Sequence, residues 1–174
     1  QQANLNTEKS VVKANGRFDL DGNDSNLNIG LDSSDAQEIQ RILTVLNISP
    51  ELEKQLNDNQ IRLAGNLKFD GNLTGNLKNP TITGRASLES VAMRGRELGA
   101  LASNISVAPD IIELRDGILR ERGGGSANFN IIIPQTGKNN ISVQATLNRI
   151  NTGNLTAALP LEDFLPENLR DIQA

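Results

Sequence analysis

The chain has 174 residues, enough for one ordinary domain, and its net charge of −4 is spread over residues of both signs. No basic patch or run points to nucleic acid or to anionic lipid, and with aromatic residues at 2%, all of them Phe, stacking platforms for bases or sugars are poorly supported. The chain has no Cys and no His, which excludes disulfides, thiol nucleophiles, imidazole catalysis and the commonest transition-metal sites.

Residues 1–32 are expected to hold a β-hairpin. Two apolar series alternate with polar residues: Gly16, Phe18 and Leu20, then Leu27, Ile29 and Leu31. A turn at the intervening DGNDSN would place Leu20 opposite Leu27 and would keep the apolar residues on one face. We interpret 1–32 as the end of a β-sheet unit.

Residues 33–60 change to helical spacing. The apolar positions are Ile39, Ile42, Leu43, Leu46, Leu52 and Leu56. Asp35 and Glu38 can form a capping box, and Ser49-Pro50 begins a second short helix because Pro suits the first helical position. We expect 33–60 to be a helical segment that crosses the sheet.

The stretch from Ile61 to Leu77, IRLAGNLKFDGNLTGNL, alternates strictly between apolar or Gly residues and polar residues. Such alternation is typical of a strand with one face out of water. Asp70-Gly71 is a possible hairpin turn, but a two-residue turn there would mix the two faces along the whole hairpin. We therefore predict one long strand, bent or bulged at its glycines.

Further strands follow within a β unit that we assign to residues 61–150. Turns are expected at Asn79-Pro80, Pro109-Asp110 and Gly137. The expected facing pairs are Leu73 with Ala86, Leu101 with Ile118, Ile105 with Leu114 and Val107 with Ile112. The predicted fold is mainly β, a long antiparallel meander curled into an open trough, or β-taco, with an apolar concave face and short helical crossings.

An internal repeat relates residues 27–60 to 141–174. The two segments share the order of strand, polar corner, helix, Pro and a second acidic, Leu-rich helix. This predicts an array of sheet units separated by helical crossings, with 151–174 as the start of the next crossing. Because the strands that should follow are missing, we expect the chain to be a piece of a longer protein.

Two interpretations of the apolar strand face remain open. In one, the helices fill the inside of the sheet and the face is ordinary core. In the other, the face lines a groove that is not wholly filled, which suits flexible acyl chains because they need volume and no hydrogen bonds. The expected groove lining is Leu63, Leu67, Phe69, Leu73, Leu77, Ile82, Leu88, Ile105, Val107, Ile112, Leu114, Phe129, Ile131, Ile133, Ile141, Val143 and Leu147.

Other candidate sites are weak. The acidic turn DLDGND (19–24) lacks the later Glu of a calcium loop, and the glycines at 123–125 are not followed by the Lys-Ser/Thr of a phosphate loop. Arg94 and Arg96 could meet a lipid headgroup, although a solvated loop is the simpler interpretation. No catalytic constellation stands out, so we expect no enzyme activity, no cofactor and no metal.

The segment from residue 65 to 133 resembles the AsmA-like superfamily, most closely its TamB-type translocation and assembly module proteins. The matching features are the glycine-spaced strand with Gly65, Gly71 and Gly75, then Asn79-Pro80, Gly84, the turn with Leu98, Gly99 and Leu101, the strand Ile112-Glu113-Leu114, and the glycines before Phe129. The chain departs from the family in being short and Asn-rich.

The resemblance implies a β-sheet trough in a protein anchored in the inner membrane and extending through the periplasm of a double-membraned bacterium. It further implies phospholipid in the groove and a barrel partner of the TamA or BamA type, bound through parts outside this chain. Our expectation is a segment that carries acyl chains between the two membranes. The alternatives are a scaffold that assists outer-membrane protein assembly by groove binding or β-augmentation, and a structural spacer.

Overall fold

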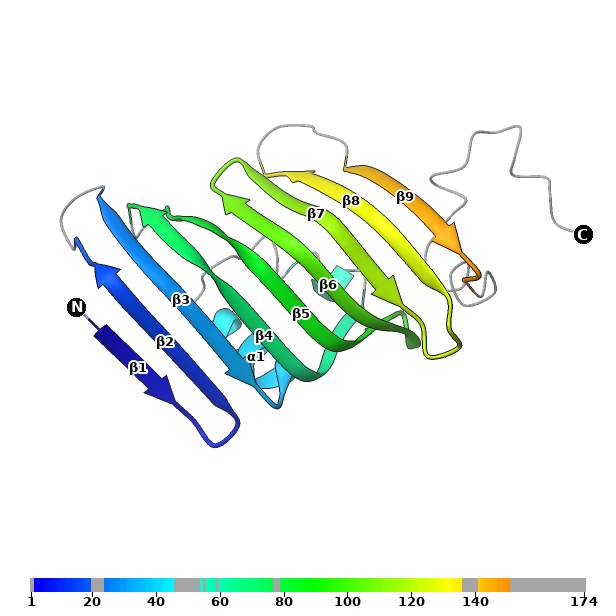
Figure 1. The fold of residues 1–174 in the computed structure, drawn as a ribbon, viewed down its shortest axis with the longest axis horizontal. Helices are drawn as coiled ribbons and strands as arrows, with labels where there is room; N and C mark the ends of the chain where they lie inside the picture. The colour runs from blue at the N-terminus through cyan, green and yellow to red at the C-terminus, as the bar shows by residue number, and fades with distance from the viewer. Residues whose placement is uncertain are drawn as a thin grey trace, which may run out of the picture.

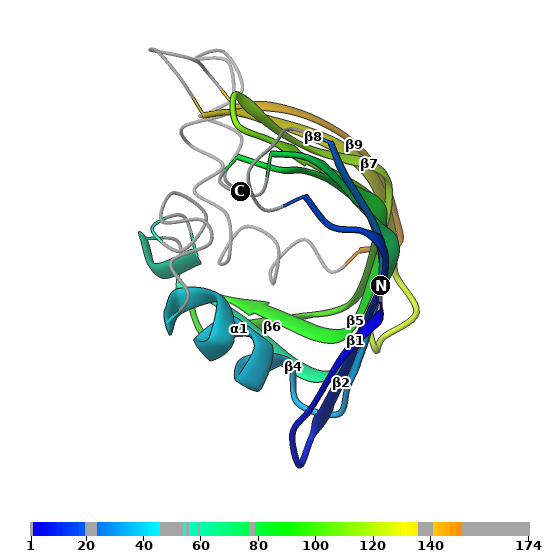
Figure 2. The same cartoon turned by 90° about the vertical axis from the view of Figure 1, so that its left-hand side faces the viewer.

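The computed structural model describes residues 2–19, 24–45, 54, 56–58, 60–76, 79–135 and 141–150. These residues form one open sheet of nine antiparallel strands in chain order, from β1 at one edge to β9 at the other, together with the helix α1 (Figure 1). The predicted mainly β antiparallel meander is therefore confirmed. Figure 2 shows that α1 lies on one side of the sheet.

Each strand pairs with the next one along the chain. The strands are β1 (Gln2–Asn6), β2 (Ser10–Arg17), β3 (Ser25–Ser33), β4 (Ile61–Gly75), β5 (Thr81–Met93), β6 (Arg96–Ala108), β7 (Ile111–Arg120), β8 (Ser126–Pro134) and β9 (Ser142–Asn148). The helix α1 (Ala36–Val45) is inserted between β3 and β4, which are neighbours in the sheet. The boundaries at 32/33, 60/61 and 150/151 stay predictions, and 151–174, including most of the second repeat copy, lie outside the described residues.

Strand β4 confirms the long strand, with 15 residues and no hairpin at Asp70-Gly71. It pairs with β3 on one side and β5 on the other, so the hydrogen-bonding groups of both edges are used. The strand bulges where expected: its register with β5 shifts between Ala64 and Leu67, and Gly65 adopts a φ of 73°. Gly tolerates this left-handed conformation because it has no Cβ. Leu77 lies outside the described residues.

The register predicted for the first hairpin is wrong by four residues. Leu27 pairs with Gly16 rather than with Leu20. The backbone N–H of Asp19 donates to the Ser25 hydroxyl at 3.0 Å, and that hydroxyl donates to the Asp19 carbonyl at 3.2 Å. These bonds join the chain at Asp19 and Ser25, just beyond the end of β2 at Arg17 and at the start of β3.

The register predicted between β4 and β5 is also wrong by four residues. Ile82 pairs with Leu73, and Ala86 pairs with Phe69 rather than with Leu73. Strand β4 ends at Gly75, whose φ is 88°, and this widens the connection to β5. Because side chains alternate with a period of two, a shift of four residues leaves every side chain on its predicted side.

The pairing of β6 with β7 is correct at one end and displaced at the other. Val107 pairs with Ile112 as predicted, but Leu101 pairs with Leu119 instead of Ile118. A bulge causes the displacement, since Asp116 adopts a φ of 51° where the register shifts. A bulge of one residue reverses the phase of alternation, which a simple count along the sequence misses.

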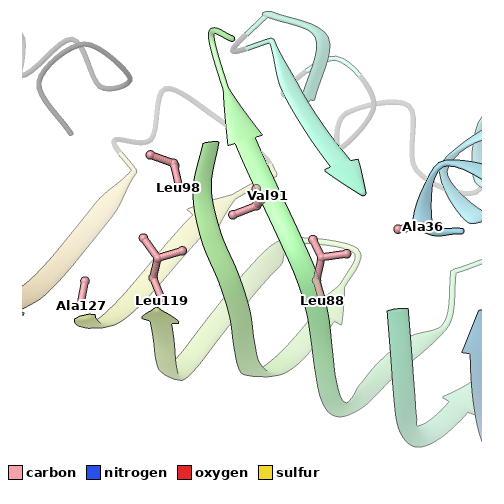
Figure 3. Close-up of a cluster of buried hydrophobic side chains, with 6 residues drawn as sticks. All are labelled: Ala36, Leu88, Val91, Leu98, Leu119 and Ala127. Atoms are coloured by element: carbon pink, nitrogen blue, oxygen red, sulfur yellow. The ribbon is translucent and has the colours of Figure 1, made fainter. Parts of the chain in front are cut away.

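The core is small and aliphatic. Figure 3 shows its buried cluster, with one residue from α1 and the others from β5 to β8: Ala36, Leu88, Val91, Leu98, Leu119 and Ala127. Ile39 of α1 is also buried, at 7% exposed. The helix therefore covers part of the sheet as ordinary core, as the packing interpretation of its apolar residues predicts.

The N-terminus of α1 is fixed to the corner of the sheet. Asp35 caps the helix by accepting the Gln37 N–H at 3.0 Å, as predicted. The part predicted for Glu38 in the capping box is wrong. Its carboxylate accepts hydrogen bonds from the hydroxyl of Thr7, at 2.9 Å, and from the hydroxyl of Ser10. Thr7 lies in the connection between β1 and β2 and Ser10 is the first residue of β2, and only the folded chain brings them to the helix.

The contact between Lys9 and Asp35 at this corner predicts how the stability of the protein changes in acid. Lys9 donates to the Asp35 carboxylate at 2.8 Å, and this hydrogen bond holds the pKa of Asp35 below its usual value. The stabilisation by Asp35 is therefore complete above the unfolded-state pKa of about 3.9 and is lost as pH falls through the lower folded-state pKa. Thermal unfolding followed by circular dichroism should show a midpoint that falls with pH over this range, and Asp35→Ala should flatten that slope. An unchanged slope in Asp35→Ala would count against this assignment.

Candidate functional site

The candidate groove lining is organised in rows that run across the strands. Residues paired across antiparallel strands point to the same side of a sheet, so the register can be followed from strand to strand. One row is Leu67, Leu88, Leu101, Leu119, Ala127 and Leu147. Two more are Gly71, Gly84, Ile105, Leu114, Ile131 and Val143, and then Leu73, Ile82, Val107, Ile112 and Ile133.

The predicted lining residues differ in how accessible they are. Leu88 and Ile112 are buried, at 6% and 5% exposed. Toward the β9 edge two of the rows reach exposed side chains, Val143 at 50% and Leu147 at 47%, and Ile141, just before β9, is 42% exposed. Those between the extremes are half-buried: Leu63, Leu67, Phe69, Leu73, Ile82, Ile105, Val107, Leu114, Phe129, Ile131 and Ile133. The row through Leu88 thus runs from buried residues to the exposed Leu147, and the row through Ile105 runs from half-buried residues to the exposed Val143.

Two phenylalanine rings of the predicted lining lie against glycines. A Cβ added to Gly71 or to Gly84 would come within 2.6 Å or 2.7 Å of the Phe69 ring. A Cβ on Gly117 would come within 2.3 Å of the ring of its paired residue, Phe129. Each ring therefore occupies the space that a side chain on the neighbouring glycine would fill. The sequence analysis assigned glycines only to bends in the strand and missed this role.

The other side of the sheet carries polar rows. Asn72 pairs with Asn28 on one side and with Thr83 on the other. Lys68 forms an ion pair with Asp32 of the neighbouring strand at 3.0 Å. Such cross-strand pairs stabilise a solvated surface, and the alternation of polar with apolar residues gives the sheet two chemically different sides.

A charged pair on β7 belongs to this polar side. The Arg115 guanidinium donates to both carboxylate oxygens of Glu113, at 2.8 Å and 3.1 Å. This hydrogen bonding lowers the pKa of Glu113 from its ordinary value. Glu113 is therefore ionised at neutral pH and held in an ion pair, which is a structural role.

An open depression of about 410 Å³ lies between β7, β8 and β9. Its lining is mainly polar and includes one predicted groove residue, Phe129: Asp116, Gly117, Ile118, Asn128, Phe129, Asn130, Gln144, Ala145 and Thr146. The Asp116 carboxylate there accepts from the Asn104 amide at 3.0 Å, and the Asp116 N–H donates to Asn130 at 2.9 Å. The sequence analysis did not single out this polar cluster.

Within the described residues, no group of three or more Asp and Glu side chains is placed to hold a metal ion. None of the helical segments described is long and apolar enough to cross a membrane. Comparison of the chain with models of known protein families, with curated proteins and with solved structures found no match. The resemblance to the AsmA-like superfamily therefore stays a prediction from the sequence pattern.

Proposed function

We propose that this chain is a non-enzymatic segment of a TamB-type protein of the AsmA-like superfamily, and that the side of the sheet bearing the apolar rows is an open, trough-shaped groove for phospholipid acyl chains. One observation supports this most directly. The row that contains the buried Leu88 ends at Leu147, and the neighbouring row ends on the same side at Val143, both at about half exposure. An ordinary core would end where its cover ends, whereas among the described residues these rows remain aliphatic beyond the part of the sheet that α1 covers.

The chemistry of the rows suits acyl chains. The lining is Leu, Ile and Val, and its two rings, Phe69 and Phe129, lie against glycines. Each methylene transferred from water to such a surface contributes about 0.8 kcal/mol without any directional bond. Acyl chains can therefore slide along the groove while their headgroups stay at its wet rim, and the direction and energy of transport come from elsewhere.

The proposal places the chain in the bacterial periplasm, within a longer protein anchored in the inner membrane. That protein would meet an outer-membrane barrel protein of the TamA or BamA type through other parts of its sequence. Phospholipid would move through the groove between the two membranes.

A second candidate function is a scaffold for outer-membrane proteins, and the β9 edge favours it. Strand β9 (Ser142–Asn148) is an edge of the sheet and contains no charged residue and no Pro. Natural edge strands usually carry such residues to prevent pairing with other chains. An unprotected edge can accept a client strand by β-augmentation.

Photo-crosslinking in cells separates these functions. A photoreactive residue at Val143, on the apolar side of β9, should give phospholipid adducts, whereas one at the adjacent Gln144, on the polar side, should give few. Adducts with outer-membrane proteins from both positions would instead support the scaffold. Equal lipid labelling at both positions, or none, would contradict the groove.

A charge in the groove tests transport itself. In cells depleted of the wild-type protein, Val143→Asp should lower phospholipid transfer between the membranes by more than tenfold, because a carboxylate among acyl chains is strongly disfavoured. Gln144→Asp places the same charge one residue away on the polar side and should leave transfer unchanged. Both positions are exposed, so neither change should unfold the sheet. Normal transfer by Val143→Asp would overturn the proposal.

A further inference from the structure

Arginines gather at one end of the sheet. They lie where β5 turns into β6, where β7 leads into β8, and just after β9 (Figure 1, lower right). We call them the arginine rim: Arg94, Arg96, Arg120, Arg122 and Arg149. All five are exposed. The same three connections contain two carboxylates, Glu97 and Glu121, so positive charge predominates there in a chain whose net charge is −4.

The three connections are neighbours in space. Residues 95–99 and 121–123 together line an open depression of about 420 Å³. A Cβ on Gly125 would come within 2.6 Å of the Arg149 carbonyl oxygen, so the chain after β9 lies against the connection between β7 and β8. The arginine rim is therefore one continuous surface.

Among the described residues, most of the rim has no ionic partner. Arg122 pairs with Glu97 at 3.2 Å. For the other four arginines, no carboxylate of the described chain lies within ion-pairing distance. An unpaired guanidinium keeps its five N–H donors available, and its planar shape matches a phosphate or carboxylate in a bidentate contact.

Two rim arginines occupy backbone positions that disfavour Arg. Arg94 and Gly95, with φ of 49° and 76°, form the two-residue turn between β5 and β6, and Arg149 has a φ of 54°. Turns of this type favour Gly, Asn and Asp, since a bulky side chain is strained at positive φ. The local backbone therefore does not explain Arg at these positions, and strain of this kind is typical of functional sites.

The rim also adjoins the apolar rows. Arg96 pairs with Met93 and so shares its side of the sheet, and Met93 packs against the buried cluster. Leu98 belongs both to that cluster and to the lining of the depression. Cationic and aliphatic surface are thus contiguous, which matches an amphiphile better than a small anion.

We propose that the arginine rim binds the phosphate of a phospholipid whose acyl chains lie on the apolar rows. This inference rests on the proposed groove function and adds a headgroup preference to it: lipids with an anionic phosphate headgroup are bound more tightly than uncharged lipids with the same chains. The rim holds the headgroup at one end of the sheet while the chains enter beside Leu98.

The test uses the purified chain and three soluble probes. These are a short-chain phosphatidylglycerol below its micelle concentration, a diacylglycerol with the same chains, and glycerol phosphate, which has no chains. Phosphatidylglycerol should bind about tenfold more tightly than diacylglycerol at low salt, and the difference should shrink as salt rises. Glycerol phosphate alone should bind weakly and compete poorly.

Two rim variants and one control complete the design. Arg94→Gly relieves the positive φ, so the unfolding midpoint should hold or rise while phosphatidylglycerol affinity falls. Arg94→Gly combined with Arg96→Gln should lower that affinity by about tenfold and leave diacylglycerol binding unchanged. Lys13→Gln removes an exposed positive charge from β2, away from the rim. This control should change neither the phosphatidylglycerol affinity nor the diacylglycerol affinity.

The outcomes separate the two proposals. If the wild-type chain binds neither lipid, the groove function and this inference both fail. Equal affinity for the two lipids, unchanged in the rim variants, overturns the headgroup site and leaves the groove standing. Full competition by glycerol phosphate would show a site for free anions only, and a parallel loss of diacylglycerol binding would show damage to the fold. Either result overturns the inference.

Discussion

Gly71→Ala is expected to lower the free energy of unfolding by about 3 kcal/mol, as measured by urea denaturation followed by circular dichroism. An added Cβ would stand 2.2 Å from the Thr83 carbonyl oxygen and 2.6 Å from the Phe69 ring. The carbonyl belongs to the β4–β5 ladder and cannot move without breaking it, so the strain falls on the backbone.

Gly30→Ala is the matched control on the neighbouring strand β3. An added Cβ there would find its nearest atom, a carboxylate oxygen of Asp70, at an ordinary 3.6 Å. Replacing Gly by Ala at a compatible position usually stabilises by about 0.4–1 kcal/mol, because the unfolded chain loses freedom. If both variants lost equal stability, the close approach of β4 and β5 at Gly71 would be refuted.

Leu88→Ala should also lower the free energy of unfolding by about 3 kcal/mol. Leu88 is 6% exposed and belongs to the buried cluster, so truncation leaves a cavity that neighbouring strands can only partly fill. Val143→Ala makes a comparable truncation at a position that is 50% exposed on the same side of the sheet. That variant should stay within about 0.5 kcal/mol of the wild type.

This comparison also bears on the groove. If Val143→Ala destabilised as strongly as Leu88→Ala, the β9 end of the rows would be packed in solution, and no accessible floor would remain for acyl chains. A small effect at Val143 beside a large one at Leu88 locates the boundary between core and groove within the rows themselves.

Alternation of apolar and polar residues was enough to predict most strands and the unbroken course of β4. It failed where a strand is held by hydrogen bonds to its neighbour and has no apolar alternation of its own. Strand β1 (Gln2–Asn6) was not predicted, because Leu5 is its only large apolar residue and its hydrogen bonds come from β2. The bulge at Asp116 was missed for a similar reason, since a left-handed residue leaves no mark on the hydropathy pattern.

For the residues of the candidate site too, the sequence indicated one part and only the structure showed the rest. The sequence pointed to Val143 and Leu147 as lining residues, but it could not show that they are half exposed while Leu88 is buried. From the sequence, Arg94 and Arg96 were candidates for a lipid headgroup contact, with a solvated loop as the simpler interpretation. Arg120 and Arg149 are distant from them in the chain and were not connected with them. Only the stacking of successive hairpins brings these arginines to one end of the sheet.

By itself, then, the sequence determined most strand-forming segments, their alternation of apolar and polar residues and the cap at Asp35, because these depend on neighbours within a few residues. The tertiary structure decided the registers, the destination of the Glu38 carboxylate and the gathering of the arginine rim. Each of these depends on how loops close and where bulges fall. Those choices are set by contacts between residues far apart in the chain, and a local pattern does not contain them.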